Sequence, residues 1–238
     1  MMAVATALAA LRPRSYLAAA ACLGLAACGP AALPAPVPVG AFEPASAADF
    51  DAMAARTLPS ARELVAIHWT FDEGDGPVTG RGAVRLAPPD SLRLDVAVPV
   101  IGRATIVLAG DSAWSQPERL ARQVAPERDL VWAMFGVVRL PVDLTALERG
   151  AGADGGELYR FARPDGLLTT LQLRDGRLLG ATAQRGPRTL GRLALTRDSA
   201  GAIVRAETVD EEHGTRFVVK VDRREASGPF PSEIWRRP

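Results

Sequence analysis

The sequence predicts a mainly β protein whose antiparallel sheet forms an unclosed barrel covered by a helical segment. Most of the chain from residue 63 onward alternates apolar and polar residues between turns rich in Gly, Asp and Pro. One block, "PERDLVWAMFGVVRL" at residues 126–140, is apolar on nearly every side. A sheet of about ten or eleven antiparallel strands must curl or close, and a helix that is apolar all round cannot face water. We therefore expect this helix to plug the open side of a half-barrel.

The N-terminus predicts export and a lipid anchor. Residues 15–27 are apolar and rich in small side chains, they follow Arg12 and Arg14, and they are too few to span a bilayer as a stable helix. They end in "LAAC", which is typical of the lipobox of bacterial lipoproteins, where a peptidase cuts before a lipidated cysteine. The alternative is a buried helix with a chance cysteine at Cys28, but the prolines that follow would leave that helix nothing to pack against.

This interpretation divides the chain into three parts: a signal peptide at residues 1–27, lipidated Cys28 with a Pro-rich tether at residues 28–44, and one half-barrel domain at residues 45–238. A covalent N-terminal diacylglycerol and acyl group on Cys28 is expected, and no other cofactor. Gly29, where an aspartate would favour retention in the inner membrane, predicts anchoring to the outer membrane, facing the periplasm.

Charge and cysteine content argue against nucleic acid binding and against a disulfide. Cleavage before Cys28 leaves 26 basic and 27 acidic residues, which argues against nucleic acid as a partner. Cys22 leaves with the signal, so no disulfide is expected within the mature chain.

Several further elements are expected along the chain. Residues 46–58 predict a short helix with Ser46 as its N-cap and Pro59 as its end. Strands follow from residue 63 to residue 123, with "RATIVLAGDSAWS" at residues 103–115 expected as one of them. Leu92, Leu94, Val96 and Val98 give the clearest alternation. "PVDLTALERG" at residues 141–150 predicts one more helical turn, and six strands with Asp-Gly-type turns predict a meander to the end.

No residues in the sequence predict catalysis. His68 and His213 do not share a spacing that would bind zinc, and no metal site is expected. The sequence contains no G-x-S-x-G elbow, phosphate loop or dinucleotide fingerprint. "DEGDG" at residues 72–76 lacks the later ligands of a calcium loop and predicts a hairpin turn. We therefore expect a protein that is not an enzyme.

The order of lipobox, Pro-rich tether, helix, "PDSLRLDV…PVIG…IVLAGD", helical block and C-terminal meander resembles the LolA/LolB family of periplasmic lipoprotein carriers and outer-membrane lipoprotein receptors. The resemblance covers residues 49–235, and "GPFPSEIW" is similar to the closing strand of that family. It implies an unclosed barrel with a helical lid, whose apolar inside receives the acyl chains of lipoproteins. It also implies that an early-strand arginine, Arg81 or Arg85, bonds to the backbone of the lid.

The receptor branch of this family has a hairpin that inserts cargo into the membrane, and the matching positions here are Pro99, Val100, Ile101 and Gly102. Two aliphatic residues at a hairpin tip favour contact with a membrane or a partner. The alternative is an ordinary turn whose Ile101 packs back onto the barrel end.

The sequence therefore predicts a monomeric outer-membrane lipoprotein that binds acyl chains or lipoproteins in an apolar half-barrel and helps deliver them to the membrane. Its expected partners are membrane lipid, lipoprotein cargo and a periplasmic carrier. The alternative is a structural or scaffolding envelope lipoprotein of the same fold with a filled core. The side chains expected to line or cover the cavity are Trp69, Leu94, Val96, Val98, Ile106, Leu108, Trp132, Met134, Phe135 and Val138.

Overall fold

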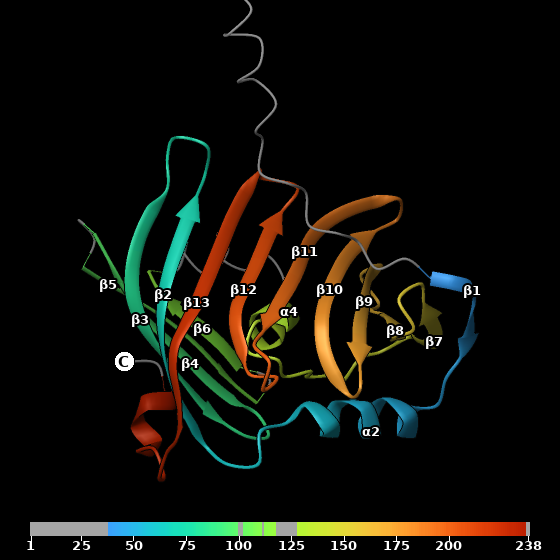
Figure 1. Ribbon diagram of the computed structural model, residues 1–238, viewed down its shortest axis with the longest axis horizontal. Helices are drawn as coiled ribbons and strands as arrows, with labels where there is room; N and C mark the ends of the chain where they lie inside the picture. The colour runs from blue at the N-terminus through green and yellow to red at the C-terminus, as the bar shows by residue number, and fades with distance from the viewer. Residues whose placement is uncertain (1–37, 100–101, 111, 118–127, 237–238) are drawn as a thin grey trace, which may run out of the picture. The chain divides into compact units, whose positions relative to one another are not determined.

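The computed structural model describes residues 38–99, 102–110, 112–117 and 128–236. In this part of the chain, one antiparallel sheet of 13 strands has the order β1-β7-β8-β9-β10-β11-β12-β13-β2-β3-β4-β5-β6 (Figure 1). No pairing joins the end strands β1 and β6 among the described residues, so the sheet is not closed. The mainly β, unclosed antiparallel architecture predicted from the sequence is confirmed. The signal peptide, Cys28 and the tether up to residue 37 lie outside the described residues.

The first half of the sheet is a run of neighbouring hairpins. Its strands are β2 (Glu63–Asp72), β3 (Val78–Ala87), β4 (Ser91–Val98), β5 (Gly102–Ala109) and β6 (Ser112–Gln116). In β4 the side chains of Leu92, Leu94 and Val96 are buried while their neighbours are more exposed, which confirms the predicted alternation. "RATIVLAGDSAWS", which the sequence suggests is one strand, forms two strands because the chain turns at Gly110, where φ is +53°.

The second half is the predicted C-terminal meander. Its strands are β8 (Glu157–Ala162), β9 (Leu167–Arg174), β10 (Arg177–Arg185), β11 (Arg188–Arg197), β12 (Ile203–Asp210) and β13 (Thr215–Ala226). Asp175 and Gly176 link β9 to β10 with φ of +52° and +72°, the conformation that a two-residue hairpin turn requires. Strand β13 pairs with β2 and thereby joins the two halves into one sheet.

Helix α2 (Ala47–Thr57) confirms the helix predicted after the tether. Its N-cap Ser46 and Asp49 form a reciprocal capping box, with Ser46 Oγ accepting from Asp49 N at 3.1 Å. Phe50 and Met53 are fully buried, and the Phe50 ring packs edge-on against Tyr159 of β8 at 5.3 Å between centroids. The helix therefore covers one end of the inner face of the sheet.

Two stretches differ from the sequence-based expectations because each pairs with the other. Residues 38–44, expected as part of the tether, form strand β1 (Pro38–Pro44), which pairs with β7 (Ala146–Gly152). Strand β7 begins within residues 141–150, the stretch expected to form a helical turn, and extends two residues past it. Prolines are tolerated at the ends of an edge strand, and pairing with both β1 and β8 satisfies more backbone groups of β7 than one helical turn would.

The C-terminal segment "GPFPSEIW" forms the 3-10 helix η1 (Ser232–Trp235) and not the closing strand implied by the family resemblance. Two of its residues are prolines, which cannot donate to a strand ladder. The segment packs on the outer face of the sheet, where Trp114 Nε1 donates to Trp235 O at 3.4 Å. Val107, on the same outer face, is fully buried. Among the described residues, no helix has both the length and the apolar character needed to cross a membrane.

Candidate functional site

The inner face of the sheet holds one continuous apolar cluster, which is the candidate site. Strands from both halves contribute to it, as do α2 and the stretch at residues 128–140, here called the central segment. Trp69 and Phe217 illustrate how the halves meet, because their ring centroids lie 6.4 Å apart across β2 and β13. The sequence-predicted members of this cluster are Trp69, Leu94, Val96, Ile106, Leu108, Trp132, Met134, Phe135 and Val138, all buried, and Val98, which is half-buried against it.

The central segment lies against this face with nearly all its apolar side chains hidden. Helix α4 (Arg128–Ala133) occupies its start, and Trp132, Phe135 and Val137 are each only 2% exposed. The helix is shorter than the predicted one at residues 126–140, of which residues 126 and 127 lie outside the described residues. It ends early because Gly136 adopts φ +81° and Val137 N donates back to Trp132 O, while Gly136 N donates to Ala133 O.

Polar contacts at the two margins hold the central segment in place. Arg224 of β13 donates to Phe135 O at 3.1 Å, and Val138 N donates to Thr57 Oγ1 at the end of α2 at 2.8 Å. At the far margin, Asp129 forms an ion pair with Arg163 at 3.7 Å. Arg139, near the end of the segment, also donates to Asp90 O at 3.2 Å. None of these bonds belongs to the strand ladder of the sheet.

One buried polar atom in the cluster has no partner. The indole Nε1 of Trp132 makes no hydrogen bond within the described part of the chain, although its residue is 2% exposed. A buried N–H without an acceptor is uncommon because its lost hydration is not replaced. The interior therefore contains one donor that a carbonyl-bearing ligand would satisfy.

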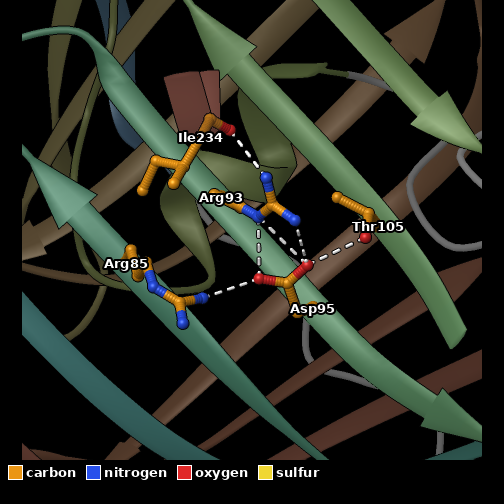
Figure 2. Close-up of polar contacts among 5 residues, drawn as sticks. All are labelled: Arg85, Arg93, Asp95, Thr105 and Ile234. Carbon is orange, nitrogen blue, oxygen red and sulfur yellow. Dashed lines mark hydrogen bonds and ion pairs between the residues drawn. The ribbon is translucent and has the colours of Figure 1, made fainter. Parts of the chain in front are cut away.

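Neither arginine suggested by the family resemblance reaches the central segment. Arg81 lies on the outer face and donates to His68 Nε2 at 2.9 Å. Arg85 also points outward and contacts Asp95 at 2.6 Å, as Figure 2 shows. In a strand, neighbouring side chains point to opposite faces, and the buried Val84 and Leu86 take the inner face of β3. The arginine that bonds to the segment backbone is Arg224 in the last strand, which the sequence did not identify.

The outer-face network of Asp95 ties the sheet to the C-terminal segment. Asp95 accepts from Arg93 at 2.8 Å and from Thr105 at 2.8 Å, and Arg93 donates to Ile234 O at 2.7 Å (Figure 2). Burial opposes ionisation of Asp95, but these hydrogen bonds and the charges of Arg93 and Arg85 outweigh it and lower the pKa of Asp95. This network has a structural role.

The predicted insertion hairpin lies between β4 and β5. Pro99 and Gly102 are exposed, and Gly102 adopts φ +93°. Val100 and Ile101, the two aliphatic residues on which the prediction depends, lie outside the described residues.

A pocket of about 190 Å³ opens beside the central segment at Phe135, Gly136 and Val137. Four arginines line it, Arg56, Arg177, Arg197 and Arg224, together with a single acidic residue, Glu63. This pocket was not predicted from the sequence. Its arginines come from α2 and from strand ends, so only the fold brings them together.

The histidines lie apart, as the sequence indicated. His68 on β2 is 2.6 Å from Asp222, and His213 is in the turn between β12 and β13, 2.7 Å from Asp210. The hydrogen bond and charge of Asp210 raise the pKa of His213. Residues 38–99, 102–110, 112–117 and 128–236 contain no group of three His, Cys, Asp or Glu side chains placed to hold a metal ion.

Comparison with known proteins supports the fold. No family model and no curated protein matches the chain. A LolA superfamily protein from Nitrosomonas europaea is similar in structure, with a TM-score of 0.51 and 11% identity over 79% of this chain and 97% of that one. A domain from Vibrio parahaemolyticus named for outer membrane lipoprotein sorting has a TM-score of 0.50 and 9% identity over 78% and 94% of the two chains. The chain therefore has a LolA-like fold, and neither of these structures is named for a catalytic activity.

Proposed function

We propose that this protein is a lipid-anchored envelope protein that binds acyl chains, or the acylated end of a lipoprotein, between the curved sheet and the central segment. The observation that carries the proposal is the central segment itself. It buries Trp132, Phe135 and Val137 on the inner face, and side-chain hydrogen bonds that involve Thr57, Arg224 and Arg139, not strand pairings, hold its C-terminal end. An acyl chain that bound there would contact the inner face of the sheet in place of the apolar side chains of the central segment.

The energetics of such an exchange are close to neutral. Burying one CH₂ group away from water contributes about 0.8 kcal/mol both in a bilayer and in an apolar protein interior, so moving it from one to the other changes the free energy little. Uptake therefore depends on the free energy that holds the central segment against the sheet, which includes the burial of its apolar side chains.

The unpaired indole N–H of Trp132 supports a ligand that carries ester or amide carbonyls. Acyl groups on glycerol or on an N-terminal cysteine have such carbonyls, whereas plain hydrocarbons do not. Trp132→Phe keeps an aromatic ring but removes the donor together with part of the indole, and we expect it to weaken binding of a diester lipid about fivefold. Affinity for the diether lipid with the same chains should not change.

Titration calorimetry with the two lipids measures this effect. The control is Trp114→Phe, which removes an indole on the outer face of the sheet. Equal weakening of diester and diether binding would rule out the carbonyl contact.

Delivery to the membrane is the second half of the proposal. Cys28 would carry the N-terminal diacylglycerol and acyl group that hold the protein at the outer membrane, and Val100 and Ile101 would enter the bilayer during release. Replacing both aliphatic residues with Glu should abolish transfer of a bound lipopeptide to vesicles while leaving its uptake intact. Val142→Glu is the control, because Val142 is an aliphatic residue with 84% exposure in a different loop. Unimpaired transfer by the double variant would assign the hairpin a purely structural role.

Displacement of an apolar fluorophore by a lipopeptide tests the binding step directly. We expect saturable fluorophore binding to the purified protein, lipopeptide displacement, and acyl lipid in organic extracts of protein purified from envelopes. Absence of all three would favour the alternative, a scaffolding lipoprotein whose interior is filled permanently by the central segment.

A further inference from the structure

The arginine pocket beside the central segment has more positive charge than its surroundings neutralise. Arg56, Arg177, Arg197 and Arg224 face the pocket, and Glu63 is the only acidic side chain that lines it. Arg56 pairs with Glu157 outside the pocket at 3.3 Å, in a contact that is half exposed. The lining alone therefore has an excess of three positive charges around about 190 Å³.

The bonds of these arginines leave donors available. Arg197 donates to Leu178 O at 3.0 Å and to Gly201 O at 2.9 Å, but its Nε is buried without a partner among the described residues. Arg224 donates to Phe135 O at 3.1 Å, and its Nε faces Glu63 Oε2 in an ion pair at 3.4 Å. The Arg177 side chain makes no hydrogen bond within the described part of the chain. A guanidinium has five N–H donors, so several remain for a ligand.

Glycines make the close approach of these side chains possible. A Cβ atom at Gly201 would overlap the guanidinium of Arg177, and a Cβ at Gly136 would lie 2.6 Å from Ile203 Cδ1 and 3.4 Å from Arg197 Nη2. Both glycines adopt positive φ, +84° and +81°. The arginine side chains can therefore come this close to the turns only because both turn positions lack a side chain.

The arginines are held together at an electrostatic cost. Burial, followed by the charges of Arg177 and Arg224, lowers the pKa of Arg197. An anion bound between these arginines would offset both the cost of burying Arg197 and the repulsion among the positive charges. A phosphate group suits such a cluster, because it accepts two parallel hydrogen bonds from one guanidinium and has a further oxygen for a second arginine.

We propose that this pocket binds the phosphate of a lipid headgroup while the acyl chains of the same lipid lie under the central segment. This inference rests on the proposed function and narrows its cargo to a phosphate-bearing lipid. The position supports it, since Phe135, Gly136 and Val137 border the pocket and also belong to the segment that covers the interior. Arg224 contacts both features through Phe135 O.

The test compares lipids that share acyl chains but differ in headgroup. Dihexanoyl phosphatidylglycerol, dihexanoylglycerol and inorganic phosphate are each titrated into the purified protein by calorimetry at low salt. We expect the anionic lipid to bind about tenfold more tightly than the neutral one. Added NaCl should reduce that preference, because part of the pocket is open to solvent.

Arg177→Gln is the decisive variant, because this side chain makes no hydrogen bond that the fold needs. It should lower affinity for the anionic lipid about fivefold and leave the neutral lipid unchanged, and Arg177→Lys should recover part of the loss. The matched control is Arg188→Gln, an exposed arginine at the far end of β11 from Arg197. Melting temperatures of all variants verify that the fold is intact.

Each outcome decides one of the two proposals. Equal affinities for the two lipids, without phosphate binding, would overturn the headgroup site and leave acyl-chain binding in place. Inorganic phosphate binding that Arg177→Gln abolishes, without a lipid preference, would assign the pocket to free phosphate and overturn its role in lipid recognition. Failure of both lipids to bind would overturn the proposed function, and the phosphate arm would then decide the pocket alone.

Discussion

Gly80 is a residue whose lack of a side chain determines how the first half of the sheet packs. It lies opposite Trp69 in the register of β2 and β3, and an added Cβ would come within 2.5 Å of the indole Cζ2 and would overlap the carbonyl of Ala97. Because the carbonyl belongs to the backbone, it cannot move aside cheaply. The indole, whose Nε1 donates to Arg81 O at 3.3 Å, is fixed as well.

Gly80→Ala should therefore lower the free energy of unfolding by about 1–3 kcal/mol. Urea denaturation measures the change. Gly228→Ala is the control, because no atom lies within 4 Å of its added Cβ, and we expect a change within about 0.5 kcal/mol. Equal stability of the two variants would show that the sheet accommodates the methyl group.

Asp95 gives a pH-dependent prediction at the same scale. Since the pKa of Asp95 in the folded protein is below its ordinary value of 3.8, its ionised form stabilises the fold. That contribution is fully present above the ordinary pKa and is lost as the pH falls through the lowered one. Asp95→Asn should reduce the free energy of unfolding by about 2 kcal/mol at pH 7, and the difference from the original protein should narrow below pH 3.8.

Denaturation curves at pH 7, pH 5 and the lowest pH at which the protein stays folded measure this dependence. Asp75→Asn, in an exposed turn, serves as the control. A difference between Asp95→Asn and the original protein that is constant from neutral to acidic pH would contradict the assignment.

Among the elements, the central segment is the one that the proposed function requires to move. Thr57 Oγ1 accepts from Val138 N at 2.8 Å and donates to Ala54 O at 2.7 Å, so one hydroxyl links the segment to α2. Thr57→Val keeps the shape but removes both bonds. It leaves the Val138 amide without an acceptor whenever the segment is docked.

We expect Thr57→Val to speed amide exchange at residues 134–138 about tenfold, because local opening becomes cheaper by about 1.4 kcal/mol. Hydrogen exchange read by mass spectrometry resolves this stretch from the strands. Thr79→Val, at an exposed position in β3, is the control and should leave amide exchange at residues 134–138 unchanged. Unaltered protection in Thr57→Val would mean that apolar packing alone holds the segment.

The elements also show which parts of the structure could be predicted from the sequence. Period-two alternation and Asp-Gly turns are local signals, and they predicted the strands of the meander and of β2–β4 correctly. The length of α4 was wrong although Gly136 was visible, because seven apolar residues around it suggested an uninterrupted helix. Strands β1 and β7 were missed because each depends on a partner about a hundred residues away.

The candidate site followed the same division. The apolar strand residues of the interior were identified because their alternation with polar residues predicts which side chains are buried. Arg224 and the arginine pocket were missed because the pocket assembles from α2, β10, β11 and β13. The predicted meander did contain one usable signal: Arg177 begins one strand and Arg197 ends the next, so an antiparallel pair places both at the same end.

On the scale of the whole molecule, the C-terminal segment covers the part of the outer face formed by β4 and its neighbours. Ending the chain after Ser227 would remove the acceptors of Arg93 and Trp114 and uncover Val107. We expect the truncated protein to lose at least about 2 kcal/mol of stability, the value of one buried aliphatic side chain, and to bind a surface-sensitive dye at neutral pH.

Calorimetric melting and dye fluorescence of the two lengths of chain test this expectation. Replacing Glu233 alone, which is exposed in η1, provides the control. An unchanged melting temperature after truncation would show that the segment merely rests on the sheet.

The place of β1 has a mechanical consequence for a tethered protein. Strand β1 is at the edge of the sheet and pairs only with β7, whereas the next element, α2, is fixed by the fully buried Phe50 and Met53. A force applied to the chain from its N-terminal side would act first on the hydrogen bonds between β1 and β7 and break them one after another. It would act on the buried residues of α2 only after those bonds had broken. Strand β1 would then release first under tension and add its seven residues to the extended chain, while the apolar interior stays intact.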